Sequence, residues 1–369
     1  MTMSDSTLLQ EAFIEARRGL GRTSPNPAVG AVLARDGEIV GRGHHTWDAV
    51  KHAEVLAIEQ AGERARGATL FLTLEPCSHQ GRTGPCADAV IAAGIRRVVV
   101  AMQDPNPLVR GQGLARLREA GVEVQLDSTA TAAAEALNQP FIHFMTTGRP
   151  LVTIKAALTL DGKIAAPIDN TGWITSEKAR AHVQELRYHT DAILTGIGTL
   201  LADDCLLTDR TARPRSRPLL RIVLDSQLRI PLTSRMVESA QGDVMVVTTS
   251  LASAERRRAL EDRGIRILVA DGPAGRTDVG RVVQALAAER YLSLMIEGGS
   301  KVNWAALESN AADKIFFYYA PKILGGLESL PVAGGAGKPR RADAIRFRDV
   351  TLHAITPEEF AVEAWLVKP

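Results

Sequence analysis

Apolar and polar positions follow two periods along the chain, one typical of helices and one of strands. Apolar side chains recur every three or four residues from Leu8 to Ala16, which predicts an amphipathic helix. Apolar runs at 28–33 and 39–41 flank Asp36-Gly37, a dipeptide typical of a hairpin turn. Further helices are predicted at 52–61, 85–93, 114–120 and 128–138, and further strands at 68–74, 97–102 and 122–125. These elements predict a compact α/β domain.

A turn-rich sequence at 147–150 separates this domain from a second series of elements. Ser176 is a favourable cap for a helix predicted over 176–188. Strands are predicted at 152–158, 192–196, 219–224, 244–248, 265–269, 293–296 and 315–320. Because strands that alternate with helices form mostly parallel sheets, we expect two α/β domains, 1–147 and 148–369. The tail from about 336 adds a basic stretch at 338–341, which is interpreted as a solvated loop.

Composition narrows the functional class. The 44 lysines and arginines nearly balance the 42 acidic residues, and aromatic residues are only 4%. This argues against a nucleic-acid partner, because neither a broad basic surface nor a set of base-stacking rings is available. No apolar run approaches the ~18 residues of a membrane span, and the N-terminus lacks a signal-peptide pattern, so we expect a cytoplasmic protein with no membrane partner. The three cysteines are expected to be thiols, free or bound to metal.

Three short motifs in the first domain predict a zinc site: His52-Ala53-Glu54, Pro76-Cys77 and Pro85-Cys86. One imidazole and two thiolates are three protein ligands, which leaves a position for water on a catalytic zinc ion. Glu54 is placed to take a proton from that water. Cys86 begins a helix, where the dipole is expected to lower its thiol pKa. The pattern fits the zinc-deaminase signature, although eight residues rather than two separate the cysteines.

The segment between the cysteines carries a family resemblance. Residues 73–86 read TLEPCSHQGRTGPC, and SPNPAVG at 24–30, HAE at 52–54 and DPNP at 104–107 accompany it. Over about residues 8–335 the chain resembles the bifunctional pyrimidine deaminase/reductases of riboflavin biosynthesis. The resemblance implies a cytidine-deaminase-like first domain, a dihydrofolate-reductase-like second domain and a homo-oligomer.

For the first domain, the resemblance implies hydrolytic deamination of 2,5-diamino-6-ribosylamino-4(3H)-pyrimidinone 5′-phosphate. One zinc ion would be held by His52, Cys77 and Cys86. Glu54 would carry a proton from water to the ring nitrogen and then to the departing ammonia.

Three substrate contacts are also implied by the resemblance, Asn26, His45 and Arg82. Each has a plainer interpretation: Asn26 as a turn residue, His45 or its neighbour His44 as a surface residue, and Arg82 as a solvated loop residue. His79 is rejected as a fourth metal ligand, because it would displace the water.

In the second domain, Glu297-Gly298-Gly299-Ser300 ends an apolar strand and opens a helix. The two glycines either let backbone amides meet a phosphate or form a plain tight turn. With the motifs around 160–164, 173–176, 195–199 and 202–204, it resembles the reductase half of the same family. The resemblance implies NADPH and hydride transfer to C1′ of the ribose, which opens the sugar to a ribityl chain. The implied cofactor residues are Ala157, Trp173, Thr199, Asp203, Ser226, Gly299, Ser300, Lys301, Val302, Asn303, Trp304 and Ala305. The implied substrate residues are Lys155, Thr171, Arg187, Leu207, Arg210 and Glu297.

Some of these residues have open alternatives. Lys155 lies in an apolar strand and needs a partner for its charge, either the substrate or Asp203, unless it reaches solvent at the strand end. Trp173 is either a cofactor contact or a core residue. Thr171 stands where the family often has Ser, and Cys205, interpreted as a structural thiol, stands where Pro is usual.

Two other functions compete with the two-step enzyme. A tRNA-type deaminase with an RNA-binding C-terminal domain would share the zinc site, but the balanced charge and few aromatics argue against it. A non-catalytic zinc module with a degenerate reductase domain is the third candidate. The intact set of His52, Glu54, Cys77 and Cys86 argues against such decay.

Overall fold

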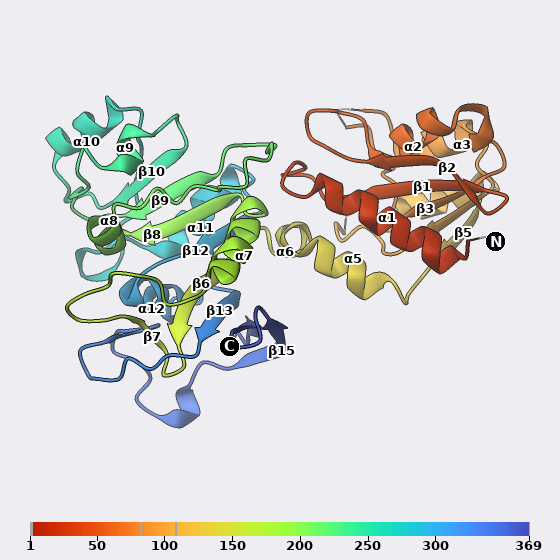
Figure 1. Ribbon diagram of the computed structural model, residues 1–369. Coiled ribbons are helices and arrows are strands. Elements are labelled where there is room, and N and C mark those ends of the chain that lie inside the picture. The colour runs from red at the N-terminus through yellow and green to blue at the C-terminus, as the bar shows by residue number, and fades with distance from the viewer. Residues whose placement is uncertain (1–2, 82, 108, 369) are drawn as a thin grey trace. The chain divides into compact units, whose positions relative to one another are not determined.

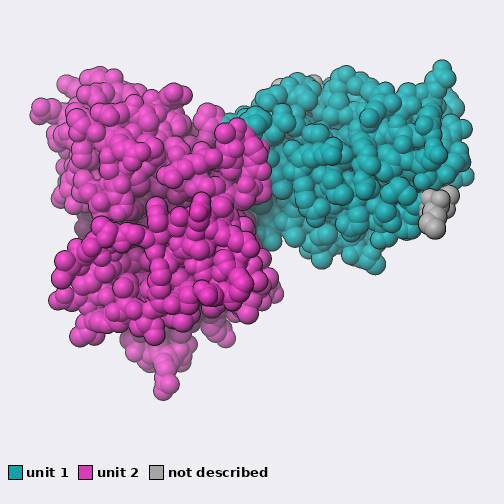
Figure 2. Space-filling view, viewed as in Figure 1, with its two compact units in different colours: residues 1–148, 214–217 teal, residues 149–213, 218–369 magenta. Residues whose placement is uncertain are grey.

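The computed structural model describes residues 3–81, 83–107 and 109–368. The chain divides into two compact units (Figure 2): unit 1 comprises 1–148 and 214–217, and unit 2 comprises 149–213 and 218–369. Over the described part of the chain, none of the helices combines the length and the apolar character that crossing a membrane requires.

Unit 1 is built on a five-stranded sheet in the order β2-β1-β3-β4-β5 (Figure 1). β1 pairs antiparallel with β2 and β3, while β3, β4 and β5 are parallel. The strands are β1 Gly30–Arg35, β2 Glu38–His44, β3 Thr69–Leu72, β4 Arg97–Val100 and β5 Glu123–Leu126. The helices are α1 Asp5–Gly19, α2 Ala53–Ala61, α3 Cys86–Ala92, α4 Gln112–Glu119, α5 Thr131–Leu137 and α6 Gln139–Thr147.

Apolar side chains on both faces of this sheet explain why helices cover each of them. One core joins α2, α3 and α4 to the sheet, and a second core joins α1 and α5 to the other face. The predicted hairpin is confirmed, with Asp36 and Gly37 at φ 53° and 79° in its turn. Gly30 lets α1 pack directly on β1, because a Cβ there would lie 1.9 Å from the Ala12 carbonyl oxygen.

Unit 2 contains a nine-stranded sheet in the order β11-β10-β9-β8-β12-β6-β13-β16-β15. It is parallel from β11 to β13, as predicted, and antiparallel from β13 to β15. The strands are β6 Leu151–Thr159, β8 Ala192–Gly196, β9 Leu220–Leu224, β10 Val244–Thr248, β11 Arg266–Val269, β12 Ser293–Ile296, β13 Lys314–Ala320, β15 Phe347–Ala354 and β16 Phe360–Leu366, with a separate pair β7 Lys163–Ala165 and β14 Leu330–Pro331.

Helices cover both faces of the larger sheet as well. The helices are α7 Glu177–Tyr188, α8 Ile197–Asp203, α9 Arg235–Glu238, α10 Ala254–Glu261, α11 Val279–Ala288 and α12 Ser300–Glu308. α11 and α12 contribute to the core on one face, whereas α7 to α10 pack on the other. Ser176 caps α7 as predicted, accepting a hydrogen bond from the Ala179 N–H.

The basic stretch 338–341 is exposed, as expected for a solvated loop. Several elements were not predicted, however. Two of them lie in the tail, which supplies β15 and β16 to the sheet. These strands escaped detection because β15 is an edge strand with mostly exposed residues and therefore lacks a clear apolar alternation. Helix α6 was also missed, because Pro140 suggests a break; at the start of a helix, however, proline is favourable.

Candidate functional site

The three predicted metal ligands converge where two helices begin. His52 is the N-cap of α2, Cys86 is the first residue of α3, and Cys77 lies in the loop between β3 and α3. The Nδ1 atom of His52 lies 3.1 Å from Cys86 Sγ and 3.6 Å from Cys77 Sγ. The exposed His79 is not part of this cluster.

This donor set fits a zinc ion. The three candidate ligand atoms lie within 4.8 Å of one another. Zinc bonds of about 2.0–2.3 Å to nitrogen and sulfur place tetrahedral ligand atoms at separations of this size. One imidazole and two sulfurs leave the fourth position for water, so the residues present match a catalytic rather than a closed structural site.

The two thiols ionise in an order that differs from expectation. A hydrogen bond from the Cys86 side chain is the main cause that lowers the pKa of Cys77 to about 4, and the Cys86 backbone N–H also donates to Cys77 Sγ at 3.3 Å. The pKa of Cys86 is raised, first because its proton is shared with Cys77 and second because it is buried. The pKa of Cys86 is therefore displaced in the opposite direction to the one expected from the α3 dipole, because of the hydrogen bond with Cys77 and of burial.

Glu54 lies in the first turn of α2, beside the cluster, with only 3% of its surface exposed. Burial raises the pKa of its carboxyl to about 7, against an opposing effect of His52. A carboxyl with a pKa close to neutrality can accept and return a proton with little energetic penalty in either direction. The geometry therefore suits Glu54 for moving protons.

Asn26 and His45 meet next to the metal cluster. The rings of His45 and His52 pack edge to face at 5.1 Å. His45 Nδ1 lies 3.1 Å from the Lys51 carbonyl, which can only accept, so Nδ1 carries the hydrogen. His45 Nε2 then accepts from the amide nitrogen of Asn26 at 3.1 Å, which fixes the rotation of that amide.

The other predicted contacts in unit 1 have different positions. His44 Nδ1 lies 3.2 Å from a carboxylate oxygen of Glu15 on α1, so His45, rather than its neighbour, faces the cluster. Arg82 lies outside the described residues. Asn138, which the sequence reasoning missed, exchanges two hydrogen bonds with the Ala28 backbone and holds the segment that carries Asn26.

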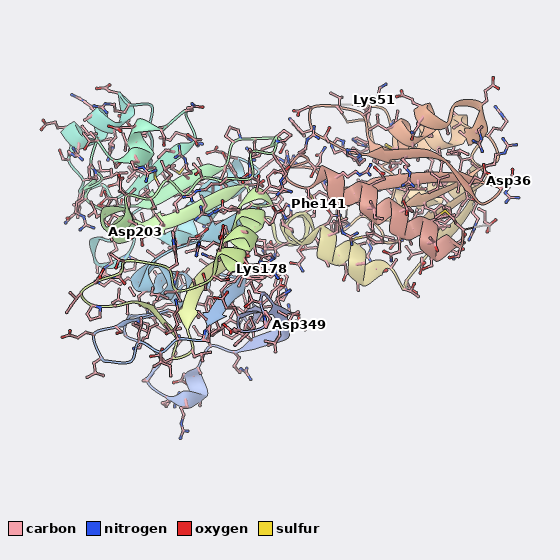
Figure 3. The ribbon with its side chains drawn as sticks, in the orientation of Figure 1. Asp36, Lys51, Phe141, Lys178, Asp203 and Asp349 are labelled. Carbon is pink, nitrogen blue, oxygen red and sulfur yellow. The ribbon has the colours of Figure 1, made fainter. Side chains whose placement is uncertain are left out.

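Unit 2 brings three predicted substrate residues into one ion-pair cluster. Glu297, at the end of β12, accepts bonds from Arg187 Nε at 2.7 Å and Nη2 at 3.0 Å, and from Lys155 Nζ at 3.2 Å. Burial by itself would raise the pKa of Glu297, but the two cations outweigh it and lower the pKa to about 2. The expectation of Asp203 as the partner of Lys155 is wrong. Asp203 is exposed at the end of α8 (Figure 3).

The start of α12 has the backbone that a phosphate group requires. Its N-cap, Gly299, makes no side-chain capping bond, and a Cβ on Gly298 would lie 2.8 Å from the Val302 side chain. A Cβ on Gly299 would lie 3.4 Å from Thr199 Oγ1, so two predicted cofactor residues are neighbours. The glycines therefore fit a cradle for a phosphorylated cofactor such as NADPH.

Residues farther along this stretch form hydrogen bonds with the backbone at 331–332. Ser300 Oγ donates to the Pro331 carbonyl at 2.5 Å, and Asn303 Nδ2 donates to the Val332 carbonyl at 2.8 Å. Lys301, Val302, Trp304 and Ala305 complete the first turns of α12.

The remaining predicted residues of unit 2 are spread over several elements. Trp173 is 68% exposed and lies under the Arg180 guanidinium, which excludes a core role. Ala157 is on β6, and Ser226 follows β9. Leu207 is buried, and its backbone φ is 52°. Arg210 and Thr171 are exposed, and the Thr171 hydroxyl donates to Asp169. Burial raises the pKa of the Cys205 thiol to about 11, in keeping with a structural thiol.

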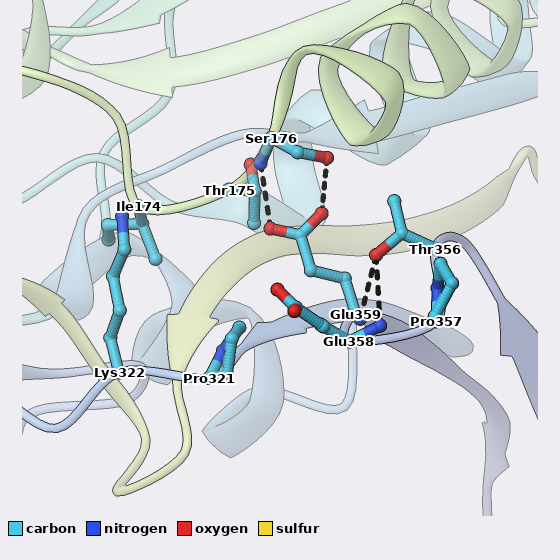
Figure 4. A pocket seen from close by; sticks show the side chains of 9 residues that line it. All are labelled: Ile174, Thr175, Ser176, Pro321, Lys322, Thr356, Pro357, Glu358 and Glu359. Carbon is cyan, nitrogen blue, oxygen red and sulfur yellow. Dashed lines mark hydrogen bonds between the residues drawn. The ribbon is translucent and has the colours of Figure 1, made fainter.

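Figure 4 shows a shallow groove in unit 2, which shares no lining residue with either cluster. It is lined by residues 174–176, 321–322 and 356–359. Its central carboxylate, Glu359, accepts from the Ser176 N–H at 2.8 Å and from the Ser176 hydroxyl. Lys322 Nζ donates to the Trp173 carbonyl at 2.8 Å. These polar groups tie α7 to the turn before β16, so the groove has a structural explanation.

Comparisons with known proteins agree with the geometry of both units. Residues 2–102 match the cytidine and deoxycytidylate deaminase zinc-binding region, and residues 150–358 match the RibD C-terminal domain. The riboflavin biosynthesis protein RibD of Actinobacillus pleuropneumoniae is 40% identical over 94% of this chain and 92% of its own length. The RibD of Escherichia coli is 39% identical over 96% and 98%.

A solved structure extends the likeness to the whole fold. RibD of Acinetobacter baumannii superimposes with a TM-score of 0.86 at 35% identity, covering 99% of both chains. A C-terminal domain of this type does not favour the alternative of an RNA-binding domain on a tRNA-type deaminase. The chain belongs to the RibD family of riboflavin biosynthesis, bifunctional enzymes that join a zinc-binding deaminase domain to a reductase domain.

Proposed function

We propose that this chain catalyses two consecutive steps on one phosphorylated pyrimidine. Residues 1–147 would deaminate 2,5-diamino-6-ribosylamino-4(3H)-pyrimidinone 5′-phosphate, and residues 148–369 would reduce the ribosyl group of the product to a ribityl chain. The observation that carries the first step is the convergence of His52, Cys77 and Cys86 beside the buried Glu54. A solved structure from Thermotoga maritima, 34% identical with a TM-score of 0.82, bears the name of this deaminase/reductase pair.

In the deaminase site, His52, Cys77 and Cys86 would hold one zinc ion, which when bound supplies an activated water. The Glu54 carboxylate would take a proton at Oε from that water, deliver it to a ring nitrogen and later protonate the departing amine. Its pKa of about 7 suits both directions of transfer. His45 holds the Asn26 amide in one orientation, which supports a role for Asn26 in recognising the pyrimidine edge. Arg82 is proposed as a phosphate contact from its motif.

In the reductase site, NADPH when bound would supply the hydride for C1′ of the ribose. The glycines at the start of α12 and Thr199 support a cofactor position there. Glu297 bonds to both Lys155 and Arg187 and so fixes where their charged groups lie, which supports a role for Lys155 in orienting the substrate. Thr171, Leu207 and Arg210 remain proposed substrate residues, as Ala157, Trp173, Asp203 and Ser226 remain proposed cofactor residues.

A reducing environment is proposed for the protein, because a site with two thiolate ligands requires reduced cysteines. None of the three cysteines is in a disulfide bond. This supports the cytoplasmic location that we proposed from the sequence. A homo-oligomer is proposed from the family resemblance.

The decisive experiment incubates the protein with the diamino-pyrimidinone phosphate, with and without NADPH. We expect ammonia release in both cases. When NADPH is present, we also expect its nicotinamide absorbance to fall as the deaminated product is reduced. The Glu54→Gln variant should retain zinc, release no ammonia, and still oxidise NADPH with the deaminated substrate. Ammonia release at the wild-type rate by Glu54→Gln would refute the proton-transfer role.

A further inference from the structure

One buried carboxylate near the metal cluster has no part in the mechanism described above. Glu75 is 5% exposed and stands two positions before Cys77. Its Oε2 accepts the backbone N–H groups of Asp104 at 3.0 Å and Gly111 at 2.9 Å. Its Oε1 accepts those of Gly113 at 3.0 Å and Leu114 at 3.3 Å. A single side chain therefore gathers four amides from a segment roughly 30–40 positions further along the chain.

These bonds make Glu75 the cap of α4. The residue at the N-cap position, Gly111, has no side chain to accept the free N–H groups of the first turn. The Glu75 carboxylate accepts two of them, and its negative charge is favourable at the positive end of the helix dipole. The fold thus replaces a local cap by a distant residue, which joins α4 to the loop that carries Cys77.

Close backbone contacts strengthen the same junction. A Cβ on Gly113 would lie 2.0 Å from the Pro76 carbonyl oxygen, so α4 begins directly against the residue that precedes Cys77. The Glu75 N–H donates to the Met102 carbonyl at 3.0 Å. On the other side, the Cys77 carbonyl accepts from the Ala87 N–H at 3.1 Å, which fixes it to α3. Cys77 is therefore held between α3 and the junction that Glu75 organises.

The Asp104 carboxyl, in the turn at 104–107, lies within range of the charge of Cys77 in the metal cluster. Burial raises the pKa of Asp104, and the charges of Glu75, His79 and Cys77 also act on this carboxyl. Asp104 is therefore near the metal ligand Cys77 as well as bonded through its backbone to Glu75.

We propose that Glu75 is a positioning residue of the deaminase site. It contacts neither metal nor substrate; it holds Cys77 at its ligand position and fixes the segment from Asp104 to Leu114 against it. This inference rests on the proposed deaminase function, and it adds a requirement for a carboxylate with four acceptor sites at position 75.

The test is Glu75→Gln. Glutamine retains one acceptor oxygen but presents an NH₂ group to the second pair of backbone N–H groups, so half of the junction is lost while the side-chain shape is kept. We expect ammonia release to slow roughly 10- to 100-fold through kcat. NADPH oxidation with the deaminated substrate should not change, because unit 2 does not contain the junction.

A second readout does not depend on activity. In the zinc-loaded protein, hydrogen exchange followed by mass spectrometry should be faster in Glu75→Gln than in wild type for peptides that contain Asp104, Gly111 and Leu114. If these peptides are unprotected in the wild-type protein, or exchange equally in Glu75→Gln, the proposal is overturned. If the wild-type protein shows protection but releases no ammonia from the pyrimidine, the proposed function fails instead and the structural junction stands.

Two further variants separate positioning from simple loss of stability. Leu117→Ala removes a fully buried side chain from the same helix without touching the Glu75 bonds, and serves as the matched control. Gly113→Ala keeps the Glu75 side chain but pushes α4 away from Pro76 and Glu75, since the new Cβ would lie 2.0 Å from the Pro76 carbonyl oxygen and 3.3 Å from Glu75 Oε1, and it should reproduce the slow deamination. Equal losses of kcat in Glu75→Gln and Leu117→Ala, compared at the same drop in melting temperature, would overturn the proposal.

Discussion

Replacing Glu297 by glutamine tests how strongly the buried ion-pair cluster stabilises unit 2. The side chains of Lys155, Arg187 and Glu297 are 13%, 12% and 11% exposed, so solvent screens their interactions only weakly. Removing the carboxylate charge leaves two cations side by side in a largely buried position, which is unfavourable.

The magnitude follows from the pKa of Glu297, which is about 2 rather than the ordinary 4.5. Each pKa unit corresponds to about 1.4 kcal/mol, so the ionised form contributes about 3 kcal/mol at neutral pH. The folded-state pKa is depressed, so this contribution is complete above pH 4.5 and is lost as the pH falls toward 2. At pH 3.5 about 2 kcal/mol should remain.

Urea unfolding followed by tryptophan fluorescence measures this difference, since Trp173, Trp304 and Trp365 all lie in unit 2. The gap between wild type and Glu297→Gln should be about 3 kcal/mol at pH 7 and smaller at pH 3.5. Glu185→Gln, which breaks a half-exposed pair with Arg213, is the matched control and should change stability by under about 1 kcal/mol. An equal gap at both pH values, or none at pH 7, would refute the electrostatic account.

Three further changes test separate parts of the molecule. Cys77→Ala should abolish zinc binding, measured by atomic absorption, and destabilise unit 1; zinc near one per chain would exclude Cys77 as a ligand. Lys155→Met should leave ammonia release intact and reduce NADPH oxidation at least about 100-fold, as expected for a group that orients the substrate; an unchanged reduction rate would remove it from the site. Gly43→Ala should destabilise unit 1 by about 1–3 kcal/mol, because the new Cβ would lie 2.1 Å from the Ala53 carbonyl oxygen and displace α2; an unchanged melting temperature would contradict the close packing of α2 on β2.

The three candidate metal ligands, which the structure brings together, could be chosen from the sequence because they occupy local motifs. His52 and Glu54 are two positions apart in one helix start, and each cysteine follows a proline. Such spacings specify the local backbone, and the backbone then specifies where the side chains project. Lys155 and Glu297, in contrast, are 142 positions apart, and no periodicity pairs them. Their contact exists because β6 and β12 are neighbouring parallel strands.

Long-range bonds also explain the expectations that were wrong or incomplete. The opposite pKa shifts of Cys77 and Cys86 depend on a contact between a loop residue and the first residue of α3, which a helix-dipole argument does not include. The C-terminal strands were missed partly because β16 pairs with β13, whose residues lie more than 40 positions earlier in the chain, so that no local pattern indicates the pairing.

The sequence by itself determined the two α/β domains and the local motifs that hold His52, Glu54, Cys77 and Cys86, because these depend on short-range periodicity and on the chemistry of adjacent residues. Only the tertiary structure decided which charges pair, which thiol ionises first and which carboxylate caps α4, because burial and strand order bring together groups that are far apart in the chain.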